Sequence, residues 1–408
     1  MTIVIFCICY IFIILEHPLK ISKSATALFL GFTLWGIGFL QGVPVEGFLH
    51  SLQESSEILF FILAAMLLVE IIYSHKGFDI LVKPLYSPSK KITFIKFAFA
   101  TFFLSSVLDN LTTTIVMVTL VRAIYSIKEE RLLVVGALIL GANFGGVWSP
   151  IGDITTTMLW LGGQISAEGI IHKVFLPAFL GYSFVVATLL FFIKGNFEEK
   201  RLEESFNAKK DVLLLGLLAL ITVPFYKVLW SIRPIVGLFF NLSLLWIYLE
   251  IKARKEDSSY IRVGTLFKKI DIEGIFFFFG LLLGVSFLKE AGYLKILTEN
   301  LQLYIGNEKI IAIIMGFLSS IVDNVPLTAL VQKMYPLSLY PQDHSFWEFI
   351  TLSVGIGGNL LVIGSAAGVI AMNMEKIDFF WYLKKITPIA FLSYVLTLFF
   401  YVMFNHFY

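Results

Sequence analysis

The stretch SSVLDNLTTTIVM (Ser105–Met117) carries an aspartate, an asparagine and three threonines within a run of otherwise apolar residues. Some 214 residues later the chain repeats the pattern as SSIVDNVPLTALV (Ser319–Val331). One polar cluster written twice, each time inside an apolar segment, indicates an internal duplication. The two stretches decide how the rest of the chain is interpreted.

The composition of the chain predicts the class of protein. Residues of the AVILMFWYC set make up 58% of the 408 residues, only 15% are charged, and phenylalanine alone occurs 41 times. No soluble core needs this much apolar surface, so we predict an all-α polytopic membrane protein in contact with the lipid bilayer. Cys7 and Cys9 are spaced i and i+2 in the first apolar run, which favours neither a disulfide nor a metal site. Nothing in the sequence supports a nucleic-acid partner.

The apolar segments predict about ten membrane-crossing helices. Segments 92–126 and 309–335 are also apolar but are interrupted by the repeated motif, and each predicts a re-entrant hairpin with a polar tip. If both hairpins return to the side they entered, 22 of the 31 Lys and Arg residues lie on one side and 7 on the other. The richer side is then cytoplasmic and both termini lie outside. The ten crossing segments lie near residues 3–15, 24–42, 55–74, 131–160, 173–194, 211–229, 235–251, 272–290, 348–374 and 386–406.

The duplication extends beyond the hairpin motif. The glycine-rich blocks Gly141–Met158 and Gly357–Met374 align at an offset of 216, which places Asn143 on Asn359. Five crossings separate the two copies, and because five is odd the second copy is inverted relative to the first. Inverted repeats with broken helices are typical of secondary transporters. The predicted organisation is an N-terminal helix (1–23), a first repeat (24–194) with hairpin 92–126 and broken helix 131–160, a linker and connecting helix (195–234), and a second repeat (235–408) with hairpin 309–335 and broken helix 348–374.

The glycine-rich blocks are poor helix interior. Asn143–Asp153 contains adjacent glycines, a serine and Pro150, and Gly355–Gly368 contains five glycines. Non-helical backbone is tolerated inside a membrane only where protein buries it or where it lines a hydrated cavity. We interpret both stretches as breaks in membrane helices that face the hairpin tips, where free carbonyl groups can coordinate a cation.

Three aspartates are predicted at membrane depth: Asp109 and Asp323 at the hairpin tips and Asp153 at a helix break. An uncompensated carboxylate is costly there, so each should hold a proton, a cation or a partner. Burial favours the protonated form of a carboxyl group and a bound cation favours the ionised form, so one such group can exchange H⁺ for a metal ion. Na⁺ or Li⁺ suits the oxygen ligands present, and no cofactor is expected. The structural alternatives are helix caps for the aspartates and polar contacts between helices for the asparagines.

At these residues the sequence resembles the NhaD-type sodium/proton antiporters of the ion-transporter superfamily. The resemblance begins near residue 24 and includes both hairpin motifs, GANFGGVWSPIGDITTTMLW (Gly141–Trp160) and, more loosely, VEIIYSHKGF (Val69–Phe78). It implies inverted repeats, a homodimer and an elevator-like movement of a transport domain. In the second repeat Val369 stands where the first has Asp153, so the half-sites differ. The candidate cation and proton ligands are Asp109, Asn110, Asn143, Asp153, Thr155, Thr156, Ser319, Asp323, Asn324, Asn359 and Ser365, with Na⁺ at the three aspartates.

Other functions are weighed against this expectation. The superfamily includes carriers of dicarboxylates and oxyanions, but Asp beside Asn at both tips repels an anion unless Na⁺ is bound with it. Arsenite is neutral at pH 7 and is not excluded in this way. An intramembrane aspartyl protease using Asp109 with Asp153 or Asp323 would leave the inversion unexplained, so we do not expect an enzyme. Glu70 and His75, near the cytoplasmic end of a helix, are candidates for pH sensing or simply an interfacial pair. The expected location is a bacterial-type cytoplasmic membrane.

Overall fold

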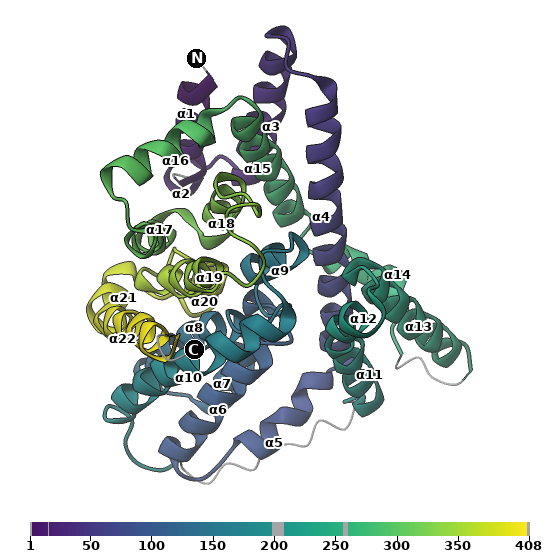
Figure 1. The fold of residues 1–408 in the computed structure, drawn as a ribbon. Coiled ribbons are helices and arrows are strands. Elements are labelled where there is room, and N and C mark those ends of the chain that lie inside the picture. The colour runs from purple at the N-terminus through teal and green to yellow at the C-terminus, as the bar shows by residue number, and fades with distance from the viewer. Residues whose placement is uncertain (1, 15, 198–207, 256–259, 406–408) are drawn as a thin grey trace.

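The computed structural model of the chain describes residues 2–14, 16–197, 208–255 and 260–405 (Figure 1). Apart from one isolated bridge between Ser89 and Asn196, the regular structure within these ranges is helical. The predicted all-α membrane class is thereby confirmed. Residues 198–207 of the predicted linker lie outside the described residues.

Seven helical segments within these ranges are long and apolar enough to cross a membrane. The other three predicted crossings are α1, which has only 13 residues, and the two interrupted segments described below. The seven are α3 (Lys23–Leu40), α4 (Val45–Ser74), α10 (Ala167–Leu190), α11 (Lys210–Ile221) with α12 (Val223–Trp230), α13 (Pro234–Lys255), α15 (Ile272–Glu290) and α22 (Thr387–Asn405).

Shorter helices connect these segments. The chain begins with α1 (Thr2–Ile14), and α16 meets α17 at a bend of 118°. The connecting helices are α2 (Glu16–Leu19), η1 (Gly77–Leu81), α5 (Val82–Leu85), α14 (Val263–Leu266), η2 (Phe267–Lys269), α16 (Tyr293–Tyr304) and α21 (Phe379–Lys385).

Both expected hairpins are pairs of short helices joined by a tight turn. The first consists of α6 (Lys90–Ser105) and α7 (Asn110–Ile124), and the second of α17 (Glu308–Val322) and α18 (Asn324–Met334). The polar motif lies at the turn in each case, because the aspartate takes the position before the second helix. Four residues separate the two helices of the first hairpin, whereas Asp323 alone separates those of the second.

Both expected helix breaks are present. In the first repeat α8 (Lys128–Gly146) ends and α9 (Ile154–Leu161) begins seven residues later. In the second, α19 (Ser345–Gly357) continues as η3 (Gly358–Leu360) before α20 (Ala366–Glu375) begins. Asn143 still belongs to the last turn of α8, so the first break is shorter than the sequence predicts.

The predicted alignment of the two breaks, at an offset of 216, is wrong by one helical turn. Asp153 (φ −142°, ψ 147°) and Ser365 (φ −148°, ψ 153°) occupy equivalent positions before α9 and α20, 212 residues apart. The same separation relates the glycines: a Cβ on Gly146 would lie 2.8 Å from the carbonyl oxygen of residue 152, and one on Gly358 would lie 2.5 Å from that of residue 364. Ser365, and not Val369, therefore takes the place of Asp153. A slip of four residues keeps the same helix face, so residue identities alone did not reveal it.

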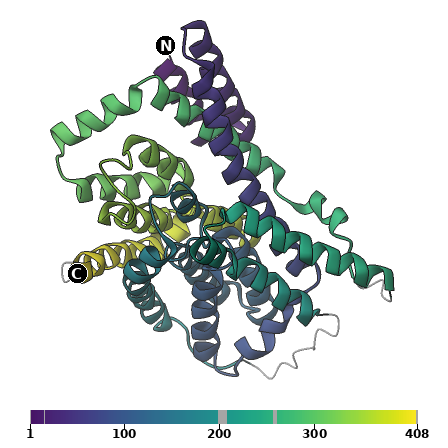
Figure 2. The ribbon, with the colours of Figure 1, turned by 45° about the vertical axis from the view of Figure 1, so that its right-hand side comes forward.

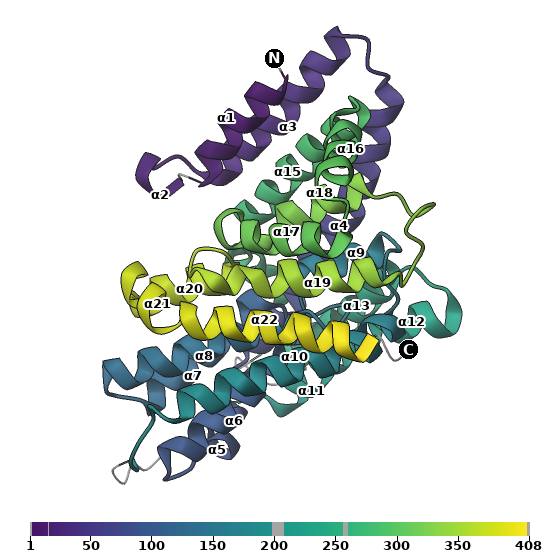
Figure 3. The ribbon, with the colours of Figure 1, turned by 60° about the vertical axis from the view of Figure 1, so that its left-hand side comes forward.

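The packing joins each hairpin to the opposite repeat. Helix α7 of the first hairpin contacts α20, and α18 of the second hairpin contacts α9. Helices α3 and α15 pack closely, because a Cβ on Gly280 would lie within 2.4 Å of the backbone of residue 27. Helices α11 and α13 lie against α4 (Figure 2), and α22 lies beside α10 and α19 (Figure 3). The two breaks and the two hairpin tips thus come together inside the molecule.

Equivalent tyrosines fix the two hairpins to their own repeats. The hydroxyl of Tyr182 on α10 lies 3.2 Å from the carbonyl of Ala98 and 3.0 Å from that of Ala137. The hydroxyl of Tyr394 on α22 lies 3.3 Å from the carbonyl of Ile313 and 2.6 Å from the Ser353 hydroxyl. Each tyrosine therefore links a hairpin arm to a broken helix, at positions 212 residues apart.

Candidate functional site

A cavity of about 670 Å³ leads from one end of α3 and α15 to the centre of the molecule. Asp109, Asp153 and Asp323 all line it, so the structure brings the three predicted acids to one space. The exposed residues Lys20 and Asp271 line its other end. That end belongs to the side that the charge pattern places in the cytoplasm.

Asp153 accepts hydrogen bonds from both hairpin tips. Its Oδ1 accepts from Nδ2 of Asn110 at 3.2 Å, and its Oδ2 accepts from Nδ2 of Asn324 at 3.0 Å and from the Thr155 hydroxyl at 2.9 Å. The carboxylate makes no capping hydrogen bond to α9, although it stands at the cap position. The alternative role as a helix cap is therefore wrong for Asp153. Its function in the fold is to join one asparagine from each repeat.

Asn143 continues this network into the second break. Its Oδ1 accepts from Asn110 at 2.9 Å, and its Nδ2 donates to Oδ1 of Asn359 at 2.7 Å and to the Ser365 hydroxyl at 2.9 Å. The Asn143 side chain is fully buried. Nδ2 of Asn359 is buried without a hydrogen-bond partner. One continuous set of amides and hydroxyls therefore connects both hairpins with both helix breaks.

Asp109 differs from the other two aspartates because its own helix satisfies it. The backbone N–H of Thr112 donates to its Oδ1 at 2.8 Å, and the Thr112 hydroxyl donates to its Oδ2 at 2.6 Å. This is the N-cap of α7. The structural alternative considered for the hairpin aspartates thus applies to Asp109.

Asp323 stands at the matching position of the second hairpin without a cap. Its side chain makes no capping hydrogen bond, and its Oδ1 is buried without a partner. Lys23 acts on it electrostatically, but the Lys23 ammonium lies over the Phe277 ring, 5.1 Å from the ring centre. Within the described ranges, no ion pair shorter than 4.0 Å joins any of the three aspartates to a Lys or Arg. A buried carboxylate oxygen without a partner marks this position as chemically unusual.

Two other candidates make structural hydrogen bonds. The Ser319 hydroxyl donates to the carbonyl of Val354 at 2.8 Å, and the Thr156 hydroxyl lies 3.4 Å from the carbonyl of Gly146. Both side chains are buried and connect a hairpin or a half-helix to its neighbour. They hold the site together from outside the amide network.

Glu70 and His75 lie away from the cavity. His75 Nδ1 lies 2.7 Å from the Ile71 carbonyl, and its Nε2 accepts from the backbone N–H of Ile261 at 3.0 Å. Burial lowers the pKa of His75 below its ordinary value. Glu70 accepts from the Ser74 hydroxyl at 2.5 Å and lies 3.4 Å from the Lys269 ammonium. The pair connects the end of α4 with the segments on either side of α14.

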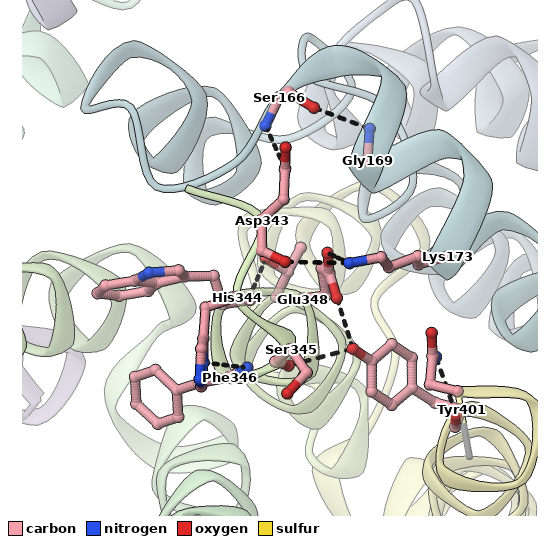
Figure 4. A network of polar contacts seen from close by, with 12 residues as sticks. Ser166, Gly169, Lys173, Asp343, His344, Ser345, Phe346, Glu348 and Tyr401 are labelled. Carbon is pink, nitrogen blue, oxygen red and sulfur yellow. Dashed lines mark hydrogen bonds and ion pairs between the residues drawn. The ribbon is translucent and has the colours of Figure 1, made fainter. Parts of the chain in front are cut away.

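Two buried ion pairs were not anticipated from the sequence. Glu348 on α19 is fully buried, accepts from the Lys173 ammonium at 2.7 Å and from the Tyr401 hydroxyl at 2.7 Å (Figure 4). Glu375 at the end of α20 is also buried and accepts from the Arg131 guanidinium at 2.9 Å. An acidic residue inside or at the end of an apolar segment was the available signal. Both pairs hold helices together at the two ends of the molecule, away from the cavity.

The described part of the chain contains no group of three or more His, Cys, Asp or Glu side chains placed to hold a metal ion. Asp109, Asp153 and Asp323 share a cavity without forming such a cluster. Any monovalent cation bound here would need amide, hydroxyl or carbonyl oxygens beside a carboxylate, which is ligand chemistry that Na⁺ accepts.

Comparison with known proteins places these features in context. Residues 10–349 match the family model described as citrate transporter. Sodium/proton antiporter 2 of Arabidopsis thaliana is 40% identical over 402 residues, which cover 95% of each chain. The Na⁺/H⁺ antiporter NhaD of Alkalimonas amylolytica is 28% identical over 96% of this chain and 88% of its own. The crystal structure of the YdaH transporter of Alcanivorax borkumensis shares the fold, with a TM-score of 0.63 and 10% identity over 95% of this chain and 99% of that one.

Proposed function

Because the chain belongs to the NhaD-type antiporters of the ion-transporter superfamily, we propose that it exchanges Na⁺ or Li⁺ for H⁺ as a secondary active transporter. The observation that carries the proposal is Asp323, whose Oδ1 is buried without a partner on the wall of the central cavity. A carboxylate in that position needs a proton or a cation for company. Competition between the two for one group couples their movements in opposite directions.

The three aspartates divide the work. Asp109 is engaged by Thr112 and fixes the first hairpin tip. Asp153 accepts three hydrogen bonds, which satisfy the lone pairs of an ionised carboxylate and hold the two tips in place. Asp323 is the exchanging group. The cation would reach it from the cytoplasmic end of the cavity, with Asn324 and Asp153 beside it.

The cavity supports a cationic substrate over an anionic one. Six acidic residues line it against two lysines, Lys20 and Lys23. A citrate or dicarboxylate entering this space would meet a net negative charge with no guanidinium to hold it. The relationship to citrate carriers therefore supports the fold and the mode of transport, while the acids support exchange of a cation.

The assay for this function uses everted membrane vesicles that contain the protein and a pH-sensitive dye. Addition of Na⁺ or Li⁺ should dissipate part of an imposed ΔpH, whereas arsenite and succinate should not. Asp153→Asn and Asp323→Asn should each abolish the response while the protein stays in the membrane. Asp378→Asn is the matched control, because Asp378 caps α21 outside the cavity. Normal exchange by both site variants would refute the site, even with the activity intact.

We further propose that the chain is a homodimer in a bacterial-type cytoplasmic membrane and needs no cofactor. The elevator-like movement would displace the hairpins and broken helices relative to α3, α4 and α15. His75 is proposed as a pH-sensitive brace on the cytoplasmic side, because protonation of its Nε2 would remove the acceptor for the N–H of Ile261. Mass measurement of the purified protein in detergent tests the dimer.

A further inference from the structure

The two hairpin tips carry the same motif with one substitution that changes its chemistry. At the separation of 214 residues, Asp109 corresponds to Asp323 and Thr112 corresponds to Pro326. Thr112 gives Asp109 two hydrogen bonds, one from its backbone N–H and one from its hydroxyl. Proline has no backbone N–H and no hydroxyl. The position that caps the first aspartate therefore cannot cap the second.

Proline is tolerated at this point of α18 for a simple reason. The first backbone N–H groups of a helix have no partner within the helix, so a residue without an N–H removes no helical hydrogen bond there. Pro326 is the third residue of α18. It deprives Asp323 of a donor without breaking the helix.

The backbone of the two tips differs as well. Asp109 has φ −61° and ψ 163°, an ordinary extended conformation at the end of a four-residue turn. Asp323 has φ 83° and ψ 144° and is the only residue between α17 and α18. This region is adopted almost only by glycine, so Asp323 is held in a strained conformation. Strain of this kind persists where the surrounding structure imposes it, commonly at functional sites.

We infer that Pro326 is a positioning residue that keeps the Asp323 carboxylate free for an oxygen-liganded monovalent cation, by excluding the capping hydrogen bonds that occupy Asp109. The first tip is thereby fixed and the second tip supplies the exchanging group. This inference rests on the proposed function, because it specifies which tip binds the cargo and which residue keeps it available.

The test replaces Pro326 by residues that restore the donors one at a time. Pro326→Ala restores the backbone N–H, and Pro326→Thr restores the N–H and the hydroxyl of the first tip. Cation binding must then displace hydrogen bonds to a charged carboxylate, so Pro326→Thr should raise the apparent KM for Na⁺ at least about tenfold with little change in maximal rate. Pro326→Ala should show a smaller rise, of about threefold. Pro336→Thr, at an exposed position after α18, is the matched control and should keep the wild-type KM.

A second readout is independent of transport. Na⁺ should raise the melting temperature of the purified wild-type protein, and the Na⁺ concentration required should increase in the same order, from wild type to Pro326→Ala to Pro326→Thr. Thr112→Val removes the hydroxyl from the first tip and should leave both the KM and this Na⁺ requirement unchanged, with a small loss of stability.

The outcomes separate this inference from the function on which it rests. A folded Pro326→Thr protein with the wild-type KM and Na⁺ requirement overturns the inference while leaving the exchange activity established. If wild-type vesicles show no exchange but Na⁺ still stabilises the purified protein, the proposed function fails and the melting series decides the role of Pro326. If Na⁺ has neither effect, both fail. Should Pro326→Thr not fold, an unchanged Na⁺ requirement in Pro326→Ala is the refuting result.

Discussion

Replacement of Asn143 by alanine tests whether the amide network at the centre of the molecule is essential. The substitution removes three buried hydrogen bonds, to Asn110, Asn359 and Ser365, and leaves Asn359 with both side-chain polar atoms unpaired. At about 0.6–1 kcal/mol for each hydrogen bond, the loss of stability should be about 2–3 kcal/mol. Asn110, one of the two asparagines that bind Asp153, also loses its support. Exchange should therefore fall at least about tenfold.

Asn241 offers a matched control for this substitution. It is also buried and also makes three side-chain hydrogen bonds, donating to the Ala219 carbonyl at 2.7 Å and to the Thr222 hydroxyl at 2.9 Å and accepting from the Tyr226 hydroxyl at 3.0 Å. These bonds connect α11, α12 and α13, away from the three aspartates. Asn241→Ala should lower the melting temperature to a similar degree and keep its exchange rate per folded molecule.

The assay combines thermal unfolding in detergent with dye dequenching in vesicles, normalised to the amount of folded protein. The reasoning predicts equal losses of stability and unequal losses of transport. Two results would refute it: an Asn143→Ala protein that exchanges at the wild-type rate, or an Asn241→Ala protein that loses as much transport as the site variant.

Lys173→Met should destabilise the protein by about 2–3 kcal/mol, less than for a fully buried pair because Lys173 is 36% exposed, and the double variant with Glu348→Gln should recover part of the loss; equal melting of single and double variants would contradict this. Burial lowers the pKa of folded His75 below its ordinary 6.5, so the folded state binds fewer protons than the unfolded state and stability should fall as the pH drops below about 6.5. His75→Gln should flatten that part of the curve of melting temperature against pH, and an unchanged curve would rule out the brace. Tyr182→Phe and Tyr394→Phe should each cost about 1 kcal/mol, and a large difference between them would argue against their equivalence.

The fold was predictable from the sequence where composition restricts the backbone. Adjacent glycines, Pro150 and the polar motif cannot continue a membrane helix, so the hairpins and breaks occur where the sequence predicts them. The register of the breaks was not predictable in this way, because matching Asn143 with Asn359 gave an offset one helical turn too long. Only the backbone geometry shows Ser365 in the place of Asp153.

The arrangement of the site was predictable in membership but not in detail. The motif identified Asp109, Asp153 and Asp323, and all three line one cavity. A residue at a helix cap position can direct its carboxylate to its own helix or elsewhere, and the sequence does not decide between them. Asp109 binds Thr112 whereas Asp153 binds asparagines from both hairpins. The contribution of Lys23 was missed, because its distance along the chain from the motifs hides its place in the cavity.

The central claim is that a cation and a proton compete for the Asp323 carboxylate, and proton release on Na⁺ binding measures this most directly. Purified protein in weakly buffered detergent solution, with a pH indicator, is titrated with Na⁺ near neutral pH. The account predicts that Na⁺ releases protons, with the amount decreasing as the pH rises, and that Asp323→Asn abolishes the release while Asp378→Asn does not. Na⁺ binding without proton release, or an unchanged release in Asp323→Asn, would contradict it.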